Sequence, residues 1–437
     1  MSAILGQYFD RLSGRRPWRW RGQVIRFLGN TIESEGPVVS VGECCEIEDM
    51  HGVRHLAEVI GFRGANVLSM PVEKADGIRF GDAVYASGMR PQVAVGDGLT
   101  GRVLDGEGVP LRGGMVHGKT VRCALENAPH NPLERMPICT PLGTGVRTID
   151  ALLTVGSGQR VGIFGGSGVG KSTLIGMMTR NTDADITVVA LVGERGREVP
   201  EFLQNAIGEK GLARSVLVVS TSDQSPLLRM RAALTATTIA EYFAGQGKNV
   251  LLVLDSLTRF AMAAREIGLA AGEPPTAKGY TPSVFDRLAK LVERAGRFRV
   301  GSITAFYTVL MEGDDQQDPL VDSVRSLLDG HLVLSRSLAS AGWYPPIELL
   351  DSVSRLMPVI TDEPHRRDAA LLRSLAATYA QSEDLVRIGA YKPGTDAEVD
   401  RALAARQPIR NFMMQGSQEQ IGYVDSVRML TALAKEL

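Results

Sequence analysis

The feature that most constrains the fold is a glycine-rich segment between an apolar run and a helical pattern. Residues 165–172 read GGSGVGKS, a full match to the phosphate-binding pattern G-x-x-x-x-G-K-[ST]. Residues 161–164 before it are typical of a buried parallel strand, and residues 171–180 after it carry apolar side chains at helical spacing. The glycines therefore fall in a strand-to-helix turn, which aims backbone N–H groups and a helix start at one anion. This arrangement predicts a nucleoside triphosphate site.

Within this site the residue types indicate separate roles. Glycines let the chain approach phosphate oxygens without a side-chain clash, Lys171 would reach the β- and γ-phosphates, and Ser172 would bind Mg²⁺. The alternative is a flexible glycine-rich loop that precedes Lys-Ser by chance, which the flanking patterns disfavour. The predicted ATP-binding residues of the loop are Gly165, Gly166, Ser167, Gly168, Val169, Gly170, Lys171, Ser172 and Thr173.

The composition limits the classes of protein to consider. The 437 residues include 48 basic and 49 acidic side chains, so the net charge of -1 gives no global electrostatic reason to expect a nucleic-acid partner. No apolar run reaches the ~18 residues of a membrane span. The arginines at positions 15 and 16 precede polar and aromatic residues rather than an apolar signal core. Four cysteines without C-x-x-C spacing favour buried reduced thiols, and we expect a cytoplasmic protein.

The hydrophobic patterns predict three domains and an α/β fold class. Short alternating runs with glycine turns predict an N-terminal β-barrel over residues 1–90. Alternating apolar strands and helical stretches predict a mainly parallel sheet with helices on both faces, in a domain over residues 91–361. Residues 362–437 carry helical patterns only and are predicted to form a C-terminal helical domain.

Individual strands follow from the same patterns. In the barrel, strands are expected at residues 22–27, 38–43, 57–62 and 66–70, with a tight hairpin at residues 63–65 between the last two. In the parallel sheet, strands are expected at residues 161–164, 186–193, 215–222, 249–256, 301–310 and 331–336.

Two carboxylates follow strands of the predicted sheet. Asp255 ends an apolar strand, where a phosphate-loop enzyme holds Mg²⁺; the alternative is an Asp that caps the helix starting near Thr258. Glu194 lies just past the end of another strand, where it would orient and polarise an attacking water as a general base. Since the carboxyl ends of parallel strands line the ligand crevice, we expect both carboxylates at the nucleotide.

The segment VGERGRE at residues 192–198 offers two further candidates. Arg195 would contact the γ-phosphate, and Glu198 would contact a water bound to the metal ion. A charged turn followed by a solvated helix start would show the same residues. The sequence leaves both interpretations open.

Seven segments in one order resemble the ATPase of type III protein export. They read GGSGVGKS, VGERGRE, LLVLDSLTRFAMAAREI, GEPPTAKGYTPSVF, GSITAFYTVLMEGDDQQDP, LLDGHLVLSR and DSVSRLMP, and the resemblance runs from about Val24 to the C-terminus. This family is similar in turn to the catalytic subunit of rotary F-type ATP synthases, which implies a RecA-like core. Residues 313–319 and 382–394 look most like the flagellar branch, whereas residues 324–330 resemble the injectisome branch.

The resemblance implies a ring of six identical subunits with a nucleotide at each interface. Arg355 matches the arginine finger that reaches the γ-phosphate bound by the neighbouring subunit, and Tyr344 matches the residue that stacks on adenine. A surface ion pair and loop packing are the respective alternatives. Lys278 and Tyr280 fall in a loop that faces the ring pore in the family, although Thr281 stands where the family usually has proline.

The function implied is that of a Mg²⁺-dependent, protein-transporting ATPase that unfolds or hands over export substrates and releases chaperones. Glu194 supports hydrolysis, because non-catalytic subunits of related rotary ATPases carry glutamine there. The implied partners are further copies of the chain, a stator-like regulator, a central stalk protein, export substrates, chaperones and an export gate at the inner membrane.

Two other classes of function stay open from the residues alone. A hexameric nucleic-acid translocase would use the same kind of sheet, and a nucleotide-binding assembly factor would lack turnover. Residues 11–27, rich in arginine and tryptophan, would contact anionic lipid, contact a partner, or form an ordinary barrel edge.

Overall fold

The computed structural model describes residues 19–112, 114, 116, 118–311 and 318–437, which form two compact units. Unit 1 comprises Met1–Gln92, Gln224–Leu228 and Ala263–Pro282, and unit 2 comprises Val93–Asp223, Arg229–Met262 and Ser283–Leu437. Two sequence predictions fall partly outside the described residues, namely residues 11–18 of the Arg/Trp-rich segment and residues 313–317 of the flagellar-like segment. Each unit is described by itself.

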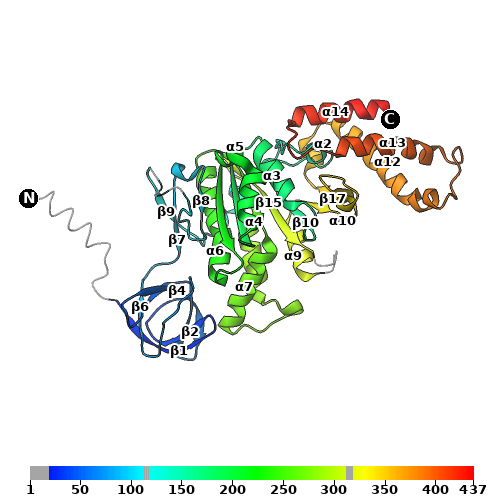
Figure 1. The fold of residues 1–437 in the computed structure, drawn as a ribbon. Helices are drawn as coiled ribbons and strands as arrows, with labels where there is room; N and C mark the ends of the chain where they lie inside the picture. The colour runs from blue at the N-terminus through cyan, green and yellow to red at the C-terminus, as the bar shows by residue number, and fades with distance from the viewer. Residues whose placement is uncertain (1–18, 113, 115, 117, 312–317) are drawn as a thin grey trace, which may run out of the picture. The chain divides into compact units, whose positions relative to one another are not determined.

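Unit 1 contains a closed six-stranded barrel, as the alternating runs predict (Figure 1, blue). Along β2 and β6 every second side chain is buried, because successive side chains point to opposite faces. Val24, Ile32, Ile47 and Val84 are at most 1% exposed inside it. The strands follow the order β1 (Arg21–Leu28), β2 (Thr31–Glu35), β5 (Asn66–Pro71), β4 (Arg54–Arg63), β3 (Cys44–Glu48) and β6 (Ala83–Ala86).

The predicted strand at residues 38–43 is wrong. Val38 and Val41 are 71% and 50% exposed, and the segment runs into a turn in which Gly42 takes φ of 82°. A positive φ ends an extended run, so pairing begins only at Cys44. The expectation of buried thiols holds for Cys44 and Cys45, whereas Cys139 is exposed.

The central element of unit 2 is a largely parallel sheet. Strand β11 is buried at eight of its nine positions, as expected for a strand covered on both faces. The strands follow the order β17 (Ile347–Ser354), β16 (Gly330–Leu334), β10 (Arg160–Gly165), β15 (Ser302–Leu310), β13 (Asn249–Asp255), β11 (Ile186–Glu194), β12 (Ser215–Thr221) and β8 (Val103–Leu104). The six strands predicted for this sheet are confirmed. Strand β17 was not predicted, and it runs antiparallel to β16.

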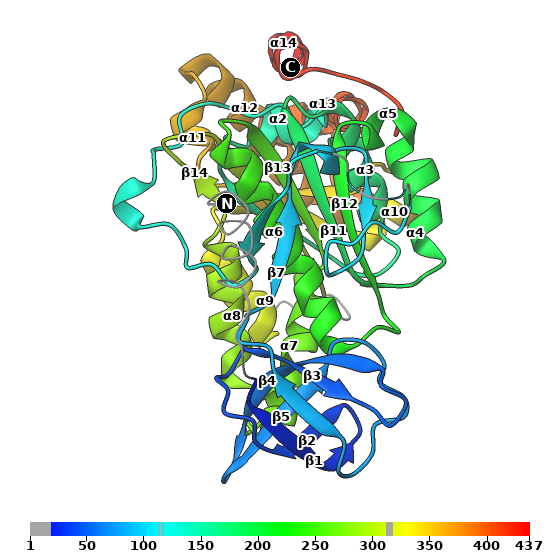
Figure 2. The same ribbon diagram turned by 90° about the vertical axis from the view of Figure 1, so that its left-hand side faces the viewer.

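Helices lie along both faces of this sheet (Figures 1 and 2). The helices of unit 2 up to residue 340 are α2 (Arg147–Leu152), α3 (Lys171–Asn181), α4 (Glu198–Glu201), the π-helical turn η3 (Phe202–Ile207), α5 (Gly208–Leu212), most of α6 (Pro226–Gly245), most of α8 (Pro282–Val292), α9 (Pro319–Leu327) and α10 (Arg336–Ser340). Helix α7 (Leu257–Ala271) begins in unit 2 and ends in unit 1. Short accessory elements complete the two units: β7 (Gln92–Val95) pairs with β9 (Val121–Ala124), β14 (Gly296–Arg297) pairs with β15, and η1 (Asp97–Leu99), η2 (Pro132–Glu134) and η4 (Ala277–Gly279) are 3-10 turns.

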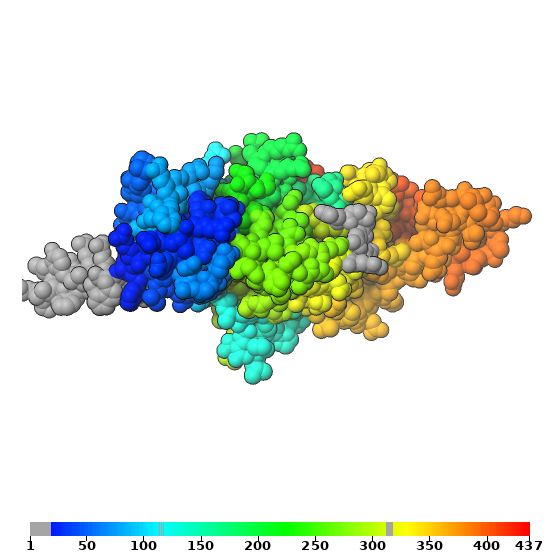
Figure 3. All heavy atoms as spheres, turned by 90° about the horizontal axis from the view of Figure 1, so that it is seen from below, coloured from blue at the N-terminus to red at the C-terminus, as the bar shows by residue number. Residues whose placement is uncertain are grey.

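The end of the chain is helical, as predicted. Helices α11 (Met357–Ile360), α12 (Glu363–Arg387), α13 (Ala397–Met413) and α14 (Tyr423–Glu436) follow the sheet within unit 2 (Figure 1), and the orange atoms of this segment form one end of unit 2 in Figure 3. His365 on α12 joins its ring Nε2 to the Ala151 carbonyl oxygen at 2.7 Å, which ties these helices to α2. None of the described helices is both long and apolar enough to cross a bilayer.

Candidate functional site

The glycine-rich loop connects β10 to α3, as its sequence predicts. Gly168 and Gly170 take φ of 77° and 94°, a region that side chains disfavour, and Gly170 occupies the cap position of α3. The structure shows no side-chain hydrogen bond at this cap, so the first N–H groups of α3 stay available. Ser167, Gly168, Ser172 and Thr173 line a cavity of about 990 Å³. The loop is therefore open to a ligand of nucleotide size.

Lys171 lies buried inside this loop with 8% of its surface exposed. Its Nζ donates to the Gly165 carbonyl oxygen at 3.0 Å and also to the Gly166 carbonyl oxygen. Burial lowers the pKa of Lys171, while the nearby carboxylates of Asp255 and Glu194 oppose that shift. A buried ammonium bonded only to backbone carbonyls is well prepared to move to phosphate oxygens.

Asp255 ends β13 beside Lys171 and is 5% exposed. Thr308 Oγ1 donates to its Oδ1 at 2.5 Å. Burial raises the pKa of Asp255, while the Thr308 hydrogen bond and the Lys171 charge oppose the rise. The helix-capping alternative does not apply, because Ser256 Oγ accepts the α7 hydrogen bond, from the Arg259 amide at 3.3 Å. Asp255 therefore does not cap α7, and the Mg²⁺ role remains the prediction for its carboxylate.

Glu194 ends the neighbouring strand β11 at a bulge. The pairing of β11 with β12 shifts between Val192 and Glu194, where Gly193 has φ of 68°. Burial raises the pKa of Glu194 to about 7, and the charge of Asp255 and contact with Glu198 add to the rise. A carboxyl group that titrates near neutral pH suits proton transfer in either direction.

Arg195 and Glu198 form a charged turn next to this glutamate. Their side chains pair at 3.4 Å, and 65% of the Arg195 side chain is exposed. Both line the 990 Å³ cavity, together with Arg180 and Arg197. The two interpretations from the sequence are thus compatible, since the turn is solvated and also borders the ligand cavity.

Arg259 on α7 is a site residue that the sequence analysis missed. Its Cβ, Cγ and Cδ lie against Gly193, within 3.4 Å of where a side chain at Gly193 would begin. Its charge opposes the raised pKa values of Glu194 and Asp255, and its buried Nε has no hydrogen-bond partner among the described residues. The available signal was an arginine four positions after the strand-ending Asp255.

Arg336, at the start of α10, is a second cation that the sequence did not single out. One guanidinium nitrogen lies 2.7 Å from the point where a Cβ on Gly166 would stand. Across the part of the chain that the structure describes, Arg336 forms no ion pair. The phosphate loop therefore has Lys171 bonded to its carbonyl oxygens and Arg336 against a glycine Cα.

Tyr344 lies at the other end of the loop. Its Cε1 stands 3.4 Å from the point where a Cβ on Gly170 would be, and the residue is 44% exposed. The Gln415 amide donates to the Tyr344 carbonyl oxygen at 2.9 Å, and Ser417 and Gln418 line the main cavity. This C-terminal segment was missed as well, because no local pattern links it to a loop about 250 residues earlier.

Arg355 lies far from the phosphate loop of its own chain. Its amide donates to the Asp329 carbonyl oxygen at 3.0 Å, and the Asp329 amide donates to the Arg160 carbonyl oxygen at 2.9 Å. Arg160 starts β10 and Gly165 ends it, so about 16 Å of strand separates the Arg355 backbone from the loop. The surface ion-pair alternative is absent within the described residues, since Arg355 is exposed and forms no ion pair there.

Lys278 and Tyr280, which the family resemblance relates to a pore-facing loop, differ from one another in exposure. Tyr280 is 5% exposed and lies under the Arg265 guanidinium, 5.8 Å from its ring centre, whereas Lys278 is exposed with φ of 52°. Of the two, only Lys278 presents its side chain to the surroundings in this structure.

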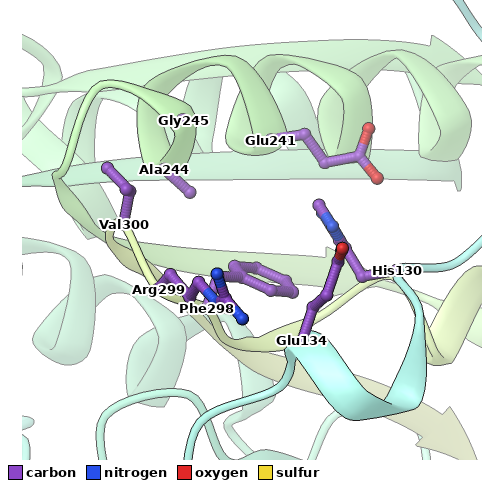
Figure 4. A pocket seen from close by; sticks show the side chains of 8 residues that line it. All are labelled: His130, Glu134, Glu241, Ala244, Gly245, Phe298, Arg299 and Val300. Atoms are coloured by element: carbon purple, nitrogen blue, oxygen red, sulfur yellow. The ribbon is translucent and has the colours of Figure 1, made fainter.

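A second cavity, of about 300 Å³, contains no phosphate-loop residue (Figure 4). His130 stacks on Phe298 with ring centres 4.2 Å apart, and Glu241 already accepts two hydrogen bonds of 2.7 Å from Arg294. Because its buried charge is already paired, this cavity offers less chemistry than the phosphate loop.

The donor set at the loop fits Mg²⁺ bound with a triphosphate. Mg²⁺ prefers hard oxygen ligands and keeps waters, with one or two protein groups and the substrate phosphates completing its shell. Ser172 borders the cavity, and Asp255 supplies a carboxylate that pairs with no arginine among the described residues. Within the described ranges no cluster of three or more His, Cys, Asp or Glu forms a cage of its own. The residues present thus fit a metal that arrives with its nucleotide.

Comparison with known proteins agrees with this geometry. The family model for the ATP synthase alpha/beta family, nucleotide-binding domain, matches residues 145–354, and that for the T3SS EscN ATPase C-terminal domain matches residues 361–432. The flagellum-specific ATP synthase of Treponema pallidum is 51% identical over 98% of this chain and 96% of its own length. The type 3 secretion system ATPase of Xanthomonas euvesicatoria is 46% identical over 95% of this chain and 94% of its own length.

Two solved structures are similar over nearly the whole chain. The assembled ATPase EscN from enteropathogenic E. coli is 45% identical with a TM-score of 0.88, and EscN in complex with its central stalk EscO is 45% identical with a TM-score of 0.87. Each comparison covers 94% of this chain and 100% of the solved one. This chain belongs to the family of flagellum-specific ATP synthases and type 3 secretion system ATPases, which are ATP-hydrolysing enzymes with a nucleotide-binding domain of the ATP synthase alpha/beta type.

Proposed function

We propose that this chain is the ATP-hydrolysing motor of a flagellar type III protein export apparatus and works as a ring of six copies. The observation that carries the proposal is the position of Arg355. Phosphate-loop residues line the cavity, and the carboxylates of Glu194 and Asp255 lie near Lys171 of that loop. Arg355 stands at the opposite end of β10 without an ion-pair partner in the described chain. A finger so placed serves a nucleotide held by another copy.

The site residues have distinct proposed roles in hydrolysis. Lys171 and Ser172 hold the phosphates with the loop amides, and Tyr344 stacks on the adenine ring. Glu194 positions the attacking water and accepts its proton. Mg²⁺, held by Ser172 and Asp255 and reached by Glu198 through water, would neutralise phosphate charge when bound.

Cations then stabilise the charge that develops on the phosphoryl group. Arg195 lines the cavity, Arg259 lies near Glu194, and Arg355 comes from the neighbouring copy. Electrostatic stabilisation by prepositioned cations is the main contribution to phosphoryl transfer, since the protein forms no covalent bond to the phosphoryl group.

The biological setting is proposed from the relatives. The stalk complex of EscN supports a central stalk partner and self-association, and the higher identity to the flagellum-specific relative supports the flagellar branch over the injectisome branch. Export substrates, chaperones, a stator-like regulator and a peripheral contact with the inner-membrane export gate are proposed from the family resemblance. No nucleic acid is expected as a partner, and the cytoplasm is the proposed location.

The test is ATP turnover against protein concentration, with molar mass recorded by light scattering on the same samples. We expect the specific rate to rise with hexamer content and to vanish in Glu194→Gln, which should still bind ATP because the loop and Lys171 are intact. The matched control is Glu201→Gln, which removes a cavity-lining carboxylate outside the proposed machinery. A rate independent of assembly, or one that Glu194→Gln retains, would contradict the proposal.

A further inference from the structure

The end of β10 that lies away from the phosphate loop holds a network of partly buried hydrogen bonds and ion pairs around Asp329. The Asp329 carboxylate accepts three hydrogen bonds from Arg160: from Nε and one terminal guanidinium nitrogen, both at 3.0 Å, and from the backbone amide at 3.1 Å. The backbone carbonyl oxygen of Asp329 accepts hydrogen bonds from the Arg355 amide at 3.0 Å and from Gln159 Nε2 at 3.1 Å. One residue thus joins the start of β10 to the segment that carries Arg355.

Ser354, directly before Arg355, is held from the same side. Gln159 Nε2 donates to Ser354 Oγ at 3.1 Å, and Ser354 Oγ donates to the Thr154 carbonyl oxygen at 2.7 Å. Gly330 lets the strands approach this closely, because a Cβ there would stand 2.6 Å from the Val353 carbonyl oxygen and 3.2 Å from Gln159 Nε2. Hydrogen bonds therefore hold the Arg355 amide and the side chain of the residue directly before it.

A further ion pair supports Arg160. Arg160 also donates to Glu293 Oε1 at 2.5 Å, and Glu293 pairs with Arg135 at 3.0 Å. Arg135 directly follows Glu134, the last residue of the η2 turn. Figure 4 shows Glu134 in the same cavity as Phe298. The network thus reaches the loop before α2, and each charge in it has a partner.

We propose that Arg160, Asp329, Gln159 and Ser354 form a clamp that positions Arg355 for hydrolysis in the neighbouring subunit. This inference rests on the proposed function, because it gives Arg355 its work in another copy. The clamp fixes only the backbone of Arg355 and leaves its guanidinium exposed and unpaired within the described chain, which is what a group acting on an external phosphate requires.

The clamp also links two nucleotide sites through one strand. β10 ends in the phosphate loop of its own subunit and starts in the clamp, and its middle residues are fully buried between β15 and β16. A strand packed in this way moves as a unit, so a shift at the phosphate loop is transmitted to the Arg355 segment.

The test compares two serines on the same strand. Ser354→Ala removes two clamp hydrogen bonds, and Ser352→Ala removes two bonds of the same kinds that do not involve the clamp, from the Val333 amide and to the Glu348 carbonyl oxygen. We expect Ser354→Ala to lower kcat by about tenfold with KM and hexamer content unchanged, and Ser352→Ala to stay within about twofold of wild type. Equal kcat values for the two variants would overturn the clamp.

A mixing experiment separates positioning from general stability. Asp329→Asn should lower kcat further than Ser354→Ala, by about a hundredfold. Asp329→Asn keeps an intact phosphate loop, and Lys171→Ala keeps an intact Arg355 with its clamp. In mixed rings of the two variants, turnover should return at each interface where the loop of an Asp329→Asn subunit meets Arg355 of a Lys171→Ala subunit. No recovery, in rings confirmed to be mixed, means that Asp329 acts within its own subunit and that the clamp is wrong.

Arg355→Ala mixed with Lys171→Ala is the reference for both ideas. Recovery with Arg355→Ala but not with Asp329→Asn rejects the clamp and keeps the proposed function. Absence of recovery with Arg355→Ala rejects the finger acting between copies, and the clamp with it. If Asp329→Asn fails to fold, Ser354→Ala is mixed with Lys171→Ala in its place, with the same expected recovery.

Discussion

The charged residues near the two ends of strand β10 differ in whether they form ion pairs. At the Gly165 end, Lys171 bonds only backbone carbonyls, and Glu194 is a carboxyl group with its pKa raised to about 7 by burial and nearby carboxylates. At the Arg160 end, Arg160 pairs with both Asp329 and Glu293. Both ends are polar, but only one leaves buried charge without a fixed ion-pair partner.

This difference suits the two ends of β10 to different roles, ligand binding at the phosphate-loop end and positioning of a backbone segment at the Arg160 end. Burying a charge without a partner costs free energy, so a protein keeps such a group where a ligand will complete it. A buried ion pair with satisfied hydrogen bonds adds little stability but fixes geometry. The phosphate-loop end is thus built to receive a ligand, and the other end is built to hold a backbone segment in place.

The largest expected effects come from removing the one cation that matters at each end. Lys171→Ala should abolish tight ATP binding, while Arg355→Ala should bind ATP normally and lose about 10³-fold in kcat. The measurements are nucleotide binding by equilibrium titration and ATP turnover. If Arg355→Ala also lost ATP binding, the two ends would not differ in kind and the comparison would break.

A smaller effect is expected at the adenine end of the loop. Tyr344→Ala removes a stacking surface, so KM should rise about tenfold with little change in kcat. Steady-state kinetics at several ATP concentrations measure the change, and Tyr344→Phe serves as the matched control because it keeps the ring. A fall in kcat without a rise in KM would mean that Tyr344 holds the phosphate loop in place and does not stack on the adenine ring.

An effect of similar size is expected from pH. Glu194 with a pKa of about 7 is protonated below that pH and then cannot accept a proton from water, so kcat/KM should fall as pH falls through 7, to about a tenth of its plateau at pH 6. Glu198→Gln removes a charge that raises the pKa of Glu194, so this limb should move to lower pH. A limb that moves upward would mean that Glu198 does not act on Glu194 by its charge.

Local chemistry explains which predictions from the sequence hold. The phosphate loop, Asp255 and Glu194 each sit at the end of a buried apolar strand, and parallel strands bring their carboxyl ends to one edge. The same reasoning failed at residues 38–43, where alternating valines precede a turn at Gly42 and stay exposed. It also failed to predict β17, whose burial alternates only in part.

The sequence by itself determined the parallel sheet, the nucleotide site and the residues at its strand ends, because spacing along one strand or one helix is a local property. Only the tertiary structure decided that Arg259 packs against Gly193, that Arg336 approaches the phosphate loop and that Arg355 stands at the far end of β10. Those facts depend on which strands become neighbours and in what direction they run. The antiparallel return of β17 beside β16 places Arg355 there, since it brings Ser354 opposite Gly330 across a separation of 24 positions in the chain.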